Sequence, residues 1–79
     1  MVRKDGAEAK KERLESIAKK IMSALSQELE ISLSKTIAVI EYEYGLSKEK
    51  ALEYLETLEK LNRFVLDKDA DKIKKMNAG

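Results

Sequence analysis

The sequence contains no cysteine, no histidine and no proline, and it has only three glycines. Without cysteine, the chain can form neither a disulfide framework nor a thiolate metal site. Because histidine is absent too, the usual zinc ligands and the commonest general base of enzymes are missing. We therefore expect a protein that is not an enzyme and that uses no cofactor and no metal. The scarcity of proline and glycine favours a chain built mostly of regular elements.

Long apolar runs are missing as well. No segment approaches the roughly 20 apolar residues that a membrane-spanning helix needs, and the N-terminal residues lack the apolar stretch of a signal peptide. These absences predict a soluble, cytoplasmic protein without a membrane partner. Amide side chains are rare, whereas charged residues make up 39% of the chain. This usage is typical of hyperthermophile proteins with surface ion-pair networks, and it favours a thermophilic archaeal source or a virus or plasmid of one.

The length of 79 residues accommodates one domain, which we place at 1–79 with a flexible basic tail at 1–8. The charge is unevenly distributed, although the net charge is only +1. Residues 1–20 carry a net charge of +3 and residues 63–79 a net charge of +2, whereas residues 21–62 carry −4. Both ends of the chain are therefore basic and its middle is acidic.

Apolar residues recur at spacings of three and four in the first third of the chain, which predicts a helix from about Ala7 to Leu29. The stripe consists of Leu14, Ile17, Ala18, Ile21, Leu25 and Leu29. The segment from Glu30 to Leu33 then alternates polar and apolar residues, as a short half-buried strand does. Ser34 follows and is predicted to cap the next helix.

Residues 35–44 are compatible with two structures. Their β-branched and aromatic residues favour a strand. A helical stripe also fits, and it consists of Leu33, Ile37, Ile40 and Tyr44. Ten residues is long for a strand and ordinary for a helix, and Gly45 supplies the left-handed residue at which a helix ends. We predict a helix, with a strand as the alternative.

A third helix is predicted from Lys48 to Leu61, capped by Ser47 and ended by Asn62, which tolerates the left-handed conformation. Its core stripe consists of Ala51, Leu55 and Leu58. Two strands, at 63–66 and 72–76, enclose a polar hairpin tip, and Ile73 is the clearest inward-pointing residue of the second strand.

The aspartates at 67, 69 and 71 have the spacing that opens a calcium-binding loop. Such a loop also needs glycine at its sixth position and glutamate at its twelfth, where this chain has Lys72 and Ala78. Turn formation at a hairpin tip therefore explains the three aspartates better than a metal site does.

Helix, short strand, helix, tight turn, helix and hairpin follow one another over residues 12–76. The segments that carry this order are ISLSK at 31–35, GLSKEKA at 45–51, YLETL at 54–58 and NRFVL at 62–66. With this pattern the chain resembles the winged helix-turn-helix family, in particular small archaeal regulators and archaeal virus or plasmid proteins. The resemblance implies a mainly α fold with a small antiparallel β-sheet, in which three helices are followed by a β-hairpin wing.

The resemblance also implies binding to double-stranded DNA, as a transcription regulator or a small chromatin-like factor. In this family the third helix enters the major groove and the wing lies along a phosphate backbone. The positions of the third helix that match the groove-facing set are Ser47, Lys48, Lys50, Leu52, Glu53, Glu56 and Thr57. The predicted DNA contacts are Ser47, Lys48, Lys50 and Thr57 from this set and Arg63, Lys68, Lys72, Lys74 and Lys75 from the wing.

The third helix departs from an ordinary reader of DNA because it contains no arginine and directs Glu53 and Glu56 toward the phosphates. A carboxylate repels DNA unless it accepts a hydrogen bond from a cytosine amino group. We therefore expect the wing and the N-terminal segment to supply much of the binding energy. The basic residues of that segment are Arg3, Lys4, Lys10, Lys11 and Arg13. The alternative is that these lysines and arginines are solvated and paired with nearby acids.

A second function remains open, namely a protein-interaction module that docks a component of a replication, transcription or other assembly machine. Val39 and Tyr42 point away from the apolar stripe of their helix, and Leu52 is apolar at a groove-facing position. The three residues are the predicted protein interface, and the acidic middle segment favours it. The N-terminal helix is longer than a three-helix core requires, which predicts a homodimer through this helix, with a frayed, charged overhang as the alternative.

Overall fold

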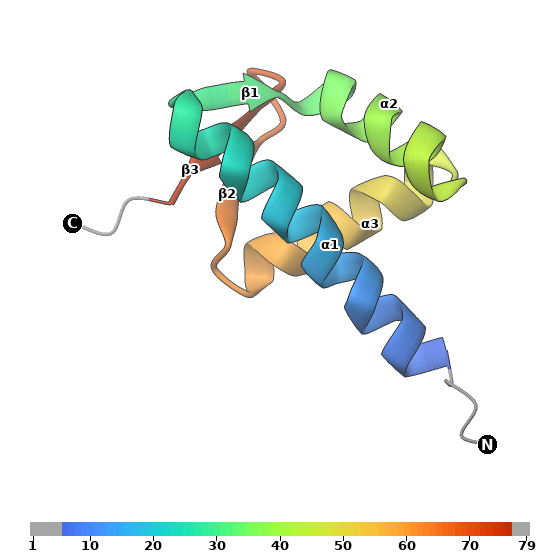
Figure 1. Ribbon diagram of the computed structural model, residues 1–79. Helices are drawn as coiled ribbons and strands as arrows, with labels where there is room; N and C mark the ends of the chain where they lie inside the picture. The colour runs from blue at the N-terminus through green and yellow to red at the C-terminus, as the bar shows by residue number, and fades with distance from the viewer. Residues whose placement is uncertain (1–5, 77–79) are drawn as a thin grey trace.

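A computed structural model describes the backbone of residues 6–76 and the side chains of residues 9–76. Residues 1–5 and 77–79, including Arg3 and Lys4, lie outside the described residues. The elements are α1 (Gly6–Gln27), β1 (Glu30–Ser32), α2 (Leu33–Tyr44), α3 (Lys48–Lys60), β2 (Phe64–Asp67) and β3 (Lys72–Lys75) (Figure 1). Three helices and a small antiparallel sheet with a hairpin wing confirm the predicted fold.

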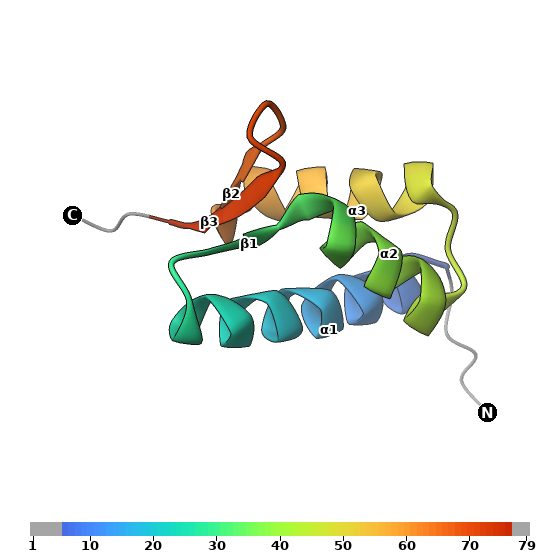
Figure 2. The same cartoon turned by 90° about the horizontal axis from the view of Figure 1, so that it is seen from above.

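The sheet has the strand order β1-β3-β2, and both strand pairs are antiparallel. The β2–β3 hairpin is the wing, and β1 joins it because Ile31 pairs with Ile73 in register. Figure 2 shows α1 along one side of the molecule and α3 along the other, with the hairpin tip projecting past α3 on the side away from α1. The wing tip and the outer side of α3 therefore face the same direction.

One apolar core joins every element. Phe64, Leu55, Leu58 and Ile73 are fully buried, and no polar or charged residue is buried in the described part of the chain. Helices α1 and α2 complete the core with Ile17, Ala18, Ile21, Leu25, Leu33, Ile37 and Ile40. Burying a side chain of this size stabilises a fold by about 1.5–3 kcal/mol, so this core holds α3 and the wing in fixed positions.

The end of α1 differs from the prediction. The helix stops at Gln27, and Leu29 is 85% exposed, so its assignment to the apolar stripe was wrong. The physical reason is that the chain leaves the helix to enter the sheet, where the Leu29 carbonyl accepts a hydrogen bond from the Lys75 amide at 3.4 Å. At the other end, residues 6–8 of the basic tail predicted at 1–8 belong to α1.

Residues 35–44 are helical, and α2 begins at Leu33. The predicted cap Ser34 is wrong by two residues, because Ser32 is the N-cap and its hydroxyl oxygen accepts from the Lys35 amide at 3.2 Å. Leu33 is the first helical residue rather than the last strand residue, because the helix is capped at Ser32, and its side chain is buried in the core. The helix ends as predicted at Gly45, whose φ is 65°.

Helix α3 has the predicted cap, since the Ser47 hydroxyl oxygen accepts from the Lys50 amide at 3.2 Å. The helix closes at Lys60, one residue earlier than predicted, and Asn62 has the predicted left-handed conformation with a φ of 62°. Strand β2 begins one residue later than predicted, and β3 ends one residue earlier.

Candidate nucleic-acid interface

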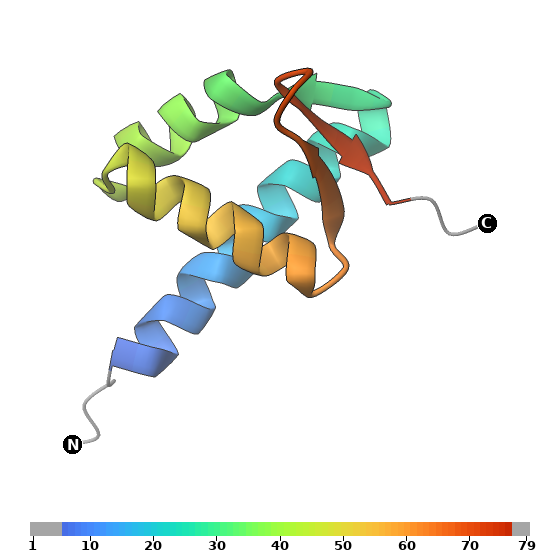
Figure 3. The ribbon, with the colours of Figure 1, turned by 180° about the vertical axis from the view of Figure 1, so that it is seen from behind.

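The outer side of α3 and the wing tip form one surface of the molecule. Figure 3 shows α3 in front of α1, with the hairpin beside it. Ala51, Tyr54, Leu55 and Leu58 direct the inner side of α3 into the core. Lys48, Lys50 and Glu53 are exposed on the outer side, and Glu56 and Thr57 are half-buried there. The Thr57 hydroxyl donates to the Glu53 carbonyl at 3.0 Å, which fixes its orientation on the helix.

Ion pairs connect α3 to the elements on either side. The Lys68 ammonium of the wing contacts the Glu56 carboxylate, and the Lys10 ammonium of α1 lies 4.0 Å from the Glu53 carboxylate. Lys50 approaches the same Glu53 carboxylate at 3.8 Å. Cations from two other elements therefore lie next to α3, and a cation of α3 itself joins them.

The Lys68 ammonium is held in its charged form. Its hydrogen bond with Glu56, followed by the coulombic attraction of that carboxylate, raises the pKa of Lys68 above its ordinary value. Lys48 also lies near Lys68, because both line the groove between α2, α3 and the wing. Lys48 makes no ion pair with the described residues, so its charge is available to an outside anion.

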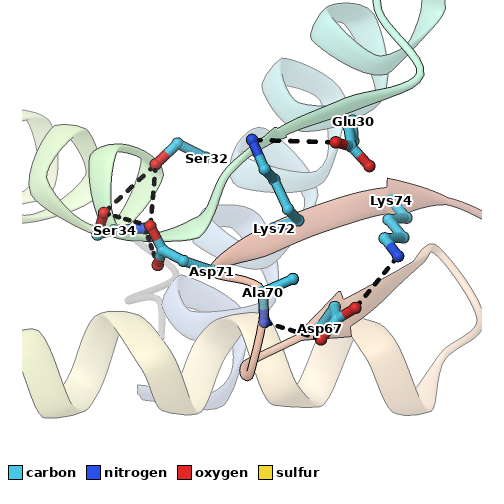
Figure 4. Close-up of polar contacts among 8 residues, drawn as sticks. All are labelled: Glu30, Ser32, Ser34, Asp67, Ala70, Asp71, Lys72 and Lys74. Atoms are coloured by element: carbon cyan, nitrogen blue, oxygen red, sulfur yellow. Dashed lines mark hydrogen bonds and ion pairs between the residues drawn. The ribbon is translucent and has the colours of Figure 1, made fainter.

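The other basic residues of the wing face different surfaces. Lys72 and Lys74 lie on the solvent face of the sheet, opposite the buried Ile73, because successive side chains of a strand alternate. Their ammonium groups contact the carboxylates of Glu30 at 3.9 Å and Asp67 at 3.1 Å, as Figure 4 shows (Figure 4).

Arg63 turns toward α1 rather than toward the wing tip, and its guanidinium contacts the Glu15 carboxylate at 3.1 Å. Lys75 is exposed near the end of β3 without an ion pair to any described residue. The structure thus brings five of the nine predicted DNA contacts to one surface, namely Ser47, Lys48, Lys50, Thr57 and Lys68. The remaining four, Arg63, Lys72, Lys74 and Lys75, are distributed around the sheet.

The wing is attached to the N-terminus of α2 by Asp71. The Asp71 carboxylate accepts from the Ser34 amide at 3.0 Å and from the hydroxyls of Ser34 at 2.7 Å and Ser32 at 3.4 Å (Figure 4). Its backbone carbonyl also accepts from the Leu33 amide at 3.0 Å. These four hydrogen bonds fix the wing tip relative to α2. The sequence pattern indicated a turn at Asp71 and missed this contact, which spans 37 residues.

Charges of the favourable sign reach both ends of α2 from other elements. The helix has no acidic residue in its first turn and no basic residue in its last turn. Asp71 supplies the negative charge at the N-terminus, and Lys20 of α1 contacts Glu43 in the last turn. An anion at a helix N-terminus and a cation at its C-terminus stabilise the helix dipole.

The three residues of the predicted protein interface do not share one environment. Tyr42 is 90% exposed and Val39 is 49% exposed. Leu52 is half-buried and packs against the core, so this apolar side chain at a predicted groove-facing position has contacts within the chain. It lines the groove between α2, α3 and the wing, together with Leu33, Ser34, Ile37, Ala38, Glu41, Lys48, Lys68 and Asp71.

Helix α1 provides little apolar surface for a second copy. Over residues 9–27, Met22 is the one exposed large hydrophobic side chain. The homodimer through the N-terminal helix stays a prediction, and the described side chains give it no apolar patch.

Among the described residues, no helix is long and apolar enough to cross a membrane.

Within residues 6–76, no group of three or more acidic, histidine or cysteine residues is arranged to hold a metal ion. The aspartates of the wing have other roles, since Asp67 contacts Lys74 and the Ala70 amide and Asp71 contacts α2.

Comparison of the chain with protein-family models, with curated proteins and with solved structures gave no match.

Proposed function

We propose that this protein binds double-stranded DNA with the surface formed by α3 and the wing tip. The observation that carries the proposal is the position of Lys68 and Lys10. Both ammonium groups contact glutamates of α3 although they come from the wing and from α1. If α3 enters the major groove, these two cations lie beside it, where the phosphate backbones of the two strands run.

The ion pairs of this surface do not prevent phosphate binding. The side chains of Lys68, Glu56, Lys50 and Glu53 are all substantially exposed. Exposed pairs of this kind contribute about 0–1 kcal/mol, so a DNA phosphate can replace the carboxylate at small cost. Each ammonium that moves to a phosphate releases condensed counterions, and this release supplies the binding free energy.

The composition of α3 favours contacts to phosphates over contacts to bases. Lys48 and Lys60 are the cations of α3 that form no ion pair with described residues, whereas Glu53 and Glu56 repel the backbone. Sequence readout is then limited to a few polar groups, such as a carboxylate that accepts from a cytosine amino group. We infer modest affinity with weak sequence preference, which fits a small chromatin-like factor or a regulator that acts with a partner.

The proposal is tested by titrating the full chain against a fluorescent duplex of random sequence while the salt concentration is raised from about 50 mM. We expect binding that weakens linearly on a log–log plot, with a slope of about −3 to −4 for roughly four phosphate contacts. A duplex taken from upstream of the protein's own gene measures any sequence preference. A chain that binds neither duplex at about 50 mM salt, where electrostatic affinity is strongest, would refute the proposal.

Charge-neutralising variants locate the surface. Lys48→Gln and Lys68→Gln should each weaken binding and make the salt slope shallower by about 1. Lys19→Gln is the matched control, because Lys19 is exposed on the side of α1 opposite its buried residues. If all three variants weaken binding equally, DNA is attracted by net charge alone and the assigned surface is wrong.

The alternative function, docking of a component of an assembly machine, remains a hypothesis. The structure divides its predicted interface, because Leu52 lines the groove between α2, α3 and the wing, whereas Val39 lines grooves on the α1 side of α2. Only Val39 and Tyr42 are left as neighbours on one exposed surface.

A further inference from the structure

Leu52 is an apolar residue of α3 that has a carboxylate on each side of it along the helix. Its side chain is half-buried, and the exposed part lines the open groove between α2, α3 and the wing. Glu49 lies three residues before Leu52 and Glu56 lies four residues after it, and side chains at these spacings are neighbours on a helix surface. An apolar contact and a hydrogen-bond acceptor are therefore offered side by side on α3.

Glu49 differs from the carboxylates farther along α3 because it has no cation beside it. Glu56 contacts Lys68, and cations of α1 and α3 approach Glu53. Glu49 is exposed in the first turn of α3, and it forms no ion pair with any described residue. The first turn of a recognition helix is the part that contacts base edges. The Glu49 carboxylate is thus available to accept a hydrogen bond from a base.

The major-groove edge of cytosine suits this pair of side chains. Its amino group donates a hydrogen bond into the groove, and a carboxylate is the usual acceptor. A methyl group on the adjacent ring carbon, C5, adds an apolar group next to that donor, and apolar side chains pack on the equivalent methyl group of thymine. Thymine itself has an acceptor oxygen in place of the amino group, so a carboxylate is repelled there.

We propose that α3 recognises 5-methylcytosine in duplex DNA, with Leu52 packed on the C5 methyl group and Glu49 accepting from the amino group. The inference rests on the proposed function, because it requires α3 in the major groove. Lys48 and Lys68 line the same groove as Leu52, so their contacts to phosphates fix the register of α3 on the duplex. The acidic and apolar residues that make α3 a poor reader of ordinary DNA are then specific contacts to a methylated base.

Three duplexes of one sequence, synthesised with different pyrimidine nucleotides, test the inference with the full chain. The first contains cytosine and uracil and has no C5 methyl group, the second contains 5-methylcytosine and uracil, and the third contains cytosine and thymine. At about 50 mM salt, the second duplex should bind about fourfold more tightly than the first, which is the value of burying one methyl group. The third should gain less, because thymine lacks the amino group.

Two variants assign the two contacts. Leu52→Ala should abolish the gain from 5-methylcytosine and retain binding to the methyl-free duplex. Glu49→Gln changes an exposed side chain without disturbing the core, and its amide group can accept from a cytosine amino group or donate to a thymine oxygen. The 5-methylcytosine and thymine duplexes should therefore bind this variant equally. This second variant decides the question even if Leu52→Ala weakens the fold.

Leu61→Ala and Glu28→Gln are the matched controls. Leu61 is an exposed apolar residue just beyond the end of α3, and Glu28 is an exposed carboxylate beside the groove between α1, β1 and α2. Both variants should bind the three duplexes in the same order as the unaltered chain does.

The outcomes separate the inference from the proposed function. Equal affinity for the methyl-free and the 5-methylcytosine duplexes overturns the inference and leaves DNA binding intact, whereas a chain that binds none of the three duplexes refutes both. A gain from 5-methylcytosine that persists in a folded Leu52→Ala variant also overturns the inference, because the methyl group would then act through another contact or through the shape of the DNA. The same holds if Glu49→Gln still prefers 5-methylcytosine to thymine.

Discussion

Asp71 illustrates how much of this fold depends on single polar side chains. Its φ of 56° is unusual for a residue other than glycine, and its carboxylate caps a helix that begins 38 residues earlier in the chain. Asp71→Ala removes the hydrogen bonds to Ser34 and Ser32, so we expect a loss of about 1–2 kcal/mol in the free energy of unfolding. Urea denaturation measures this loss.

Two further variants separate the contributions of Asp71. Asp71→Asn keeps an acceptor oxygen and tolerates the left-handed conformation. It should therefore lose only the part of the free energy of unfolding that comes from the negative charge of Asp71. Asp69→Ala changes an exposed neighbour at the same hairpin tip. Its free energy of unfolding should stay within about 0.5 kcal/mol of that of the unaltered chain. An equal loss in Asp69→Ala and Asp71→Ala would mean that the contact with α2 contributes nothing specific.

Asp67 makes the stability of the wing dependent on pH. The hydrogen bond from the Ala70 amide, and then that from Lys74, lowers the pKa of the Asp67 carboxyl below the ordinary value of 3.8. The folded state therefore binds this proton less tightly than the unfolded state does. Its stabilising contribution is complete above about pH 3.8 and is lost as the pH falls through the lower pKa of the folded state.

Asp67→Asn should accordingly destabilise the protein at neutral pH and lose that effect in acid. Thermal unfolding followed by circular dichroism at pH 7 and near pH 2 measures the difference between the variant and the unaltered chain. Asp69→Asn serves as the control for removing one negative charge from the hairpin tip. A difference that is the same at both pH values would show that the Asp67 carboxylate is not the titrating group.

At the scale of elements, α2 shows what decides between two local preferences. Its β-branched residues favour a strand, but the spacing of Leu33, Ile37 and Ile40 buries all three on one side of a helix. Gly45 then ends the helix in the left-handed conformation. Periodicity and a stop signal were therefore sufficient to predict this element, even though intrinsic propensity pointed the other way.

Gly45→Ala isolates the cost of that stop signal. A Cβ atom at position 45 meets nothing within 4 Å, so only the strained backbone conformation disfavours a side chain there. We expect a destabilisation of about 1–2 kcal/mol for Gly45→Ala and a smaller one for Gly45→Asn, since asparagine tolerates this conformation better. Chemical denaturation of both variants measures the order. Equal losses would indicate that the backbone conformation at Gly45 is not the cause.

The ends of elements were harder to predict because distant contacts set them. Leu29 has the spacing of a core residue, yet its backbone joins the sheet through Lys75, 46 residues later in the sequence. Ser34 has the local features of a helix cap, yet its hydroxyl donates to Asp71. Short-range patterns therefore gave the type and order of the elements, whereas their first and last residues depend on partners that the patterns do not contain.

At the scale of the whole molecule, the distribution of charged side chains over the surface was the feature that the sequence predicted least well. The excess of basic residues at both chain ends was evident, but the pairing of Lys68 with Glu56 and of Arg63 with Glu15 depends on tertiary structure. These pairs support the alternative that many lysines and arginines are matched with nearby acids. They also assign the cations to different surfaces, because Lys68 lies beside α3 and Arg63 turns toward α1.

The carboxylates of α3 should therefore limit the affinity for DNA. Glu56→Gln removes a negative charge from the outer side of α3 and releases Lys68 from its ion pair. The Lys68 ammonium can then contact a phosphate without competition from the Glu56 carboxylate. We expect this variant to bind random duplex about three- to tenfold more tightly and with a steeper salt dependence. Fluorescence anisotropy at several salt concentrations measures both quantities.

Glu28→Gln makes the same change in net charge at a residue that lines the groove between α1, β1 and α2. If DNA lies on α3 and the wing tip, this control should gain little, because screening at about 0.1 M salt limits its influence to about 10 Å. Equal gains in the two variants would show that DNA responds only to the net charge of the chain. A loss of affinity in Glu56→Gln would show instead that this carboxylate contacts a base, most directly the amino group of a cytosine.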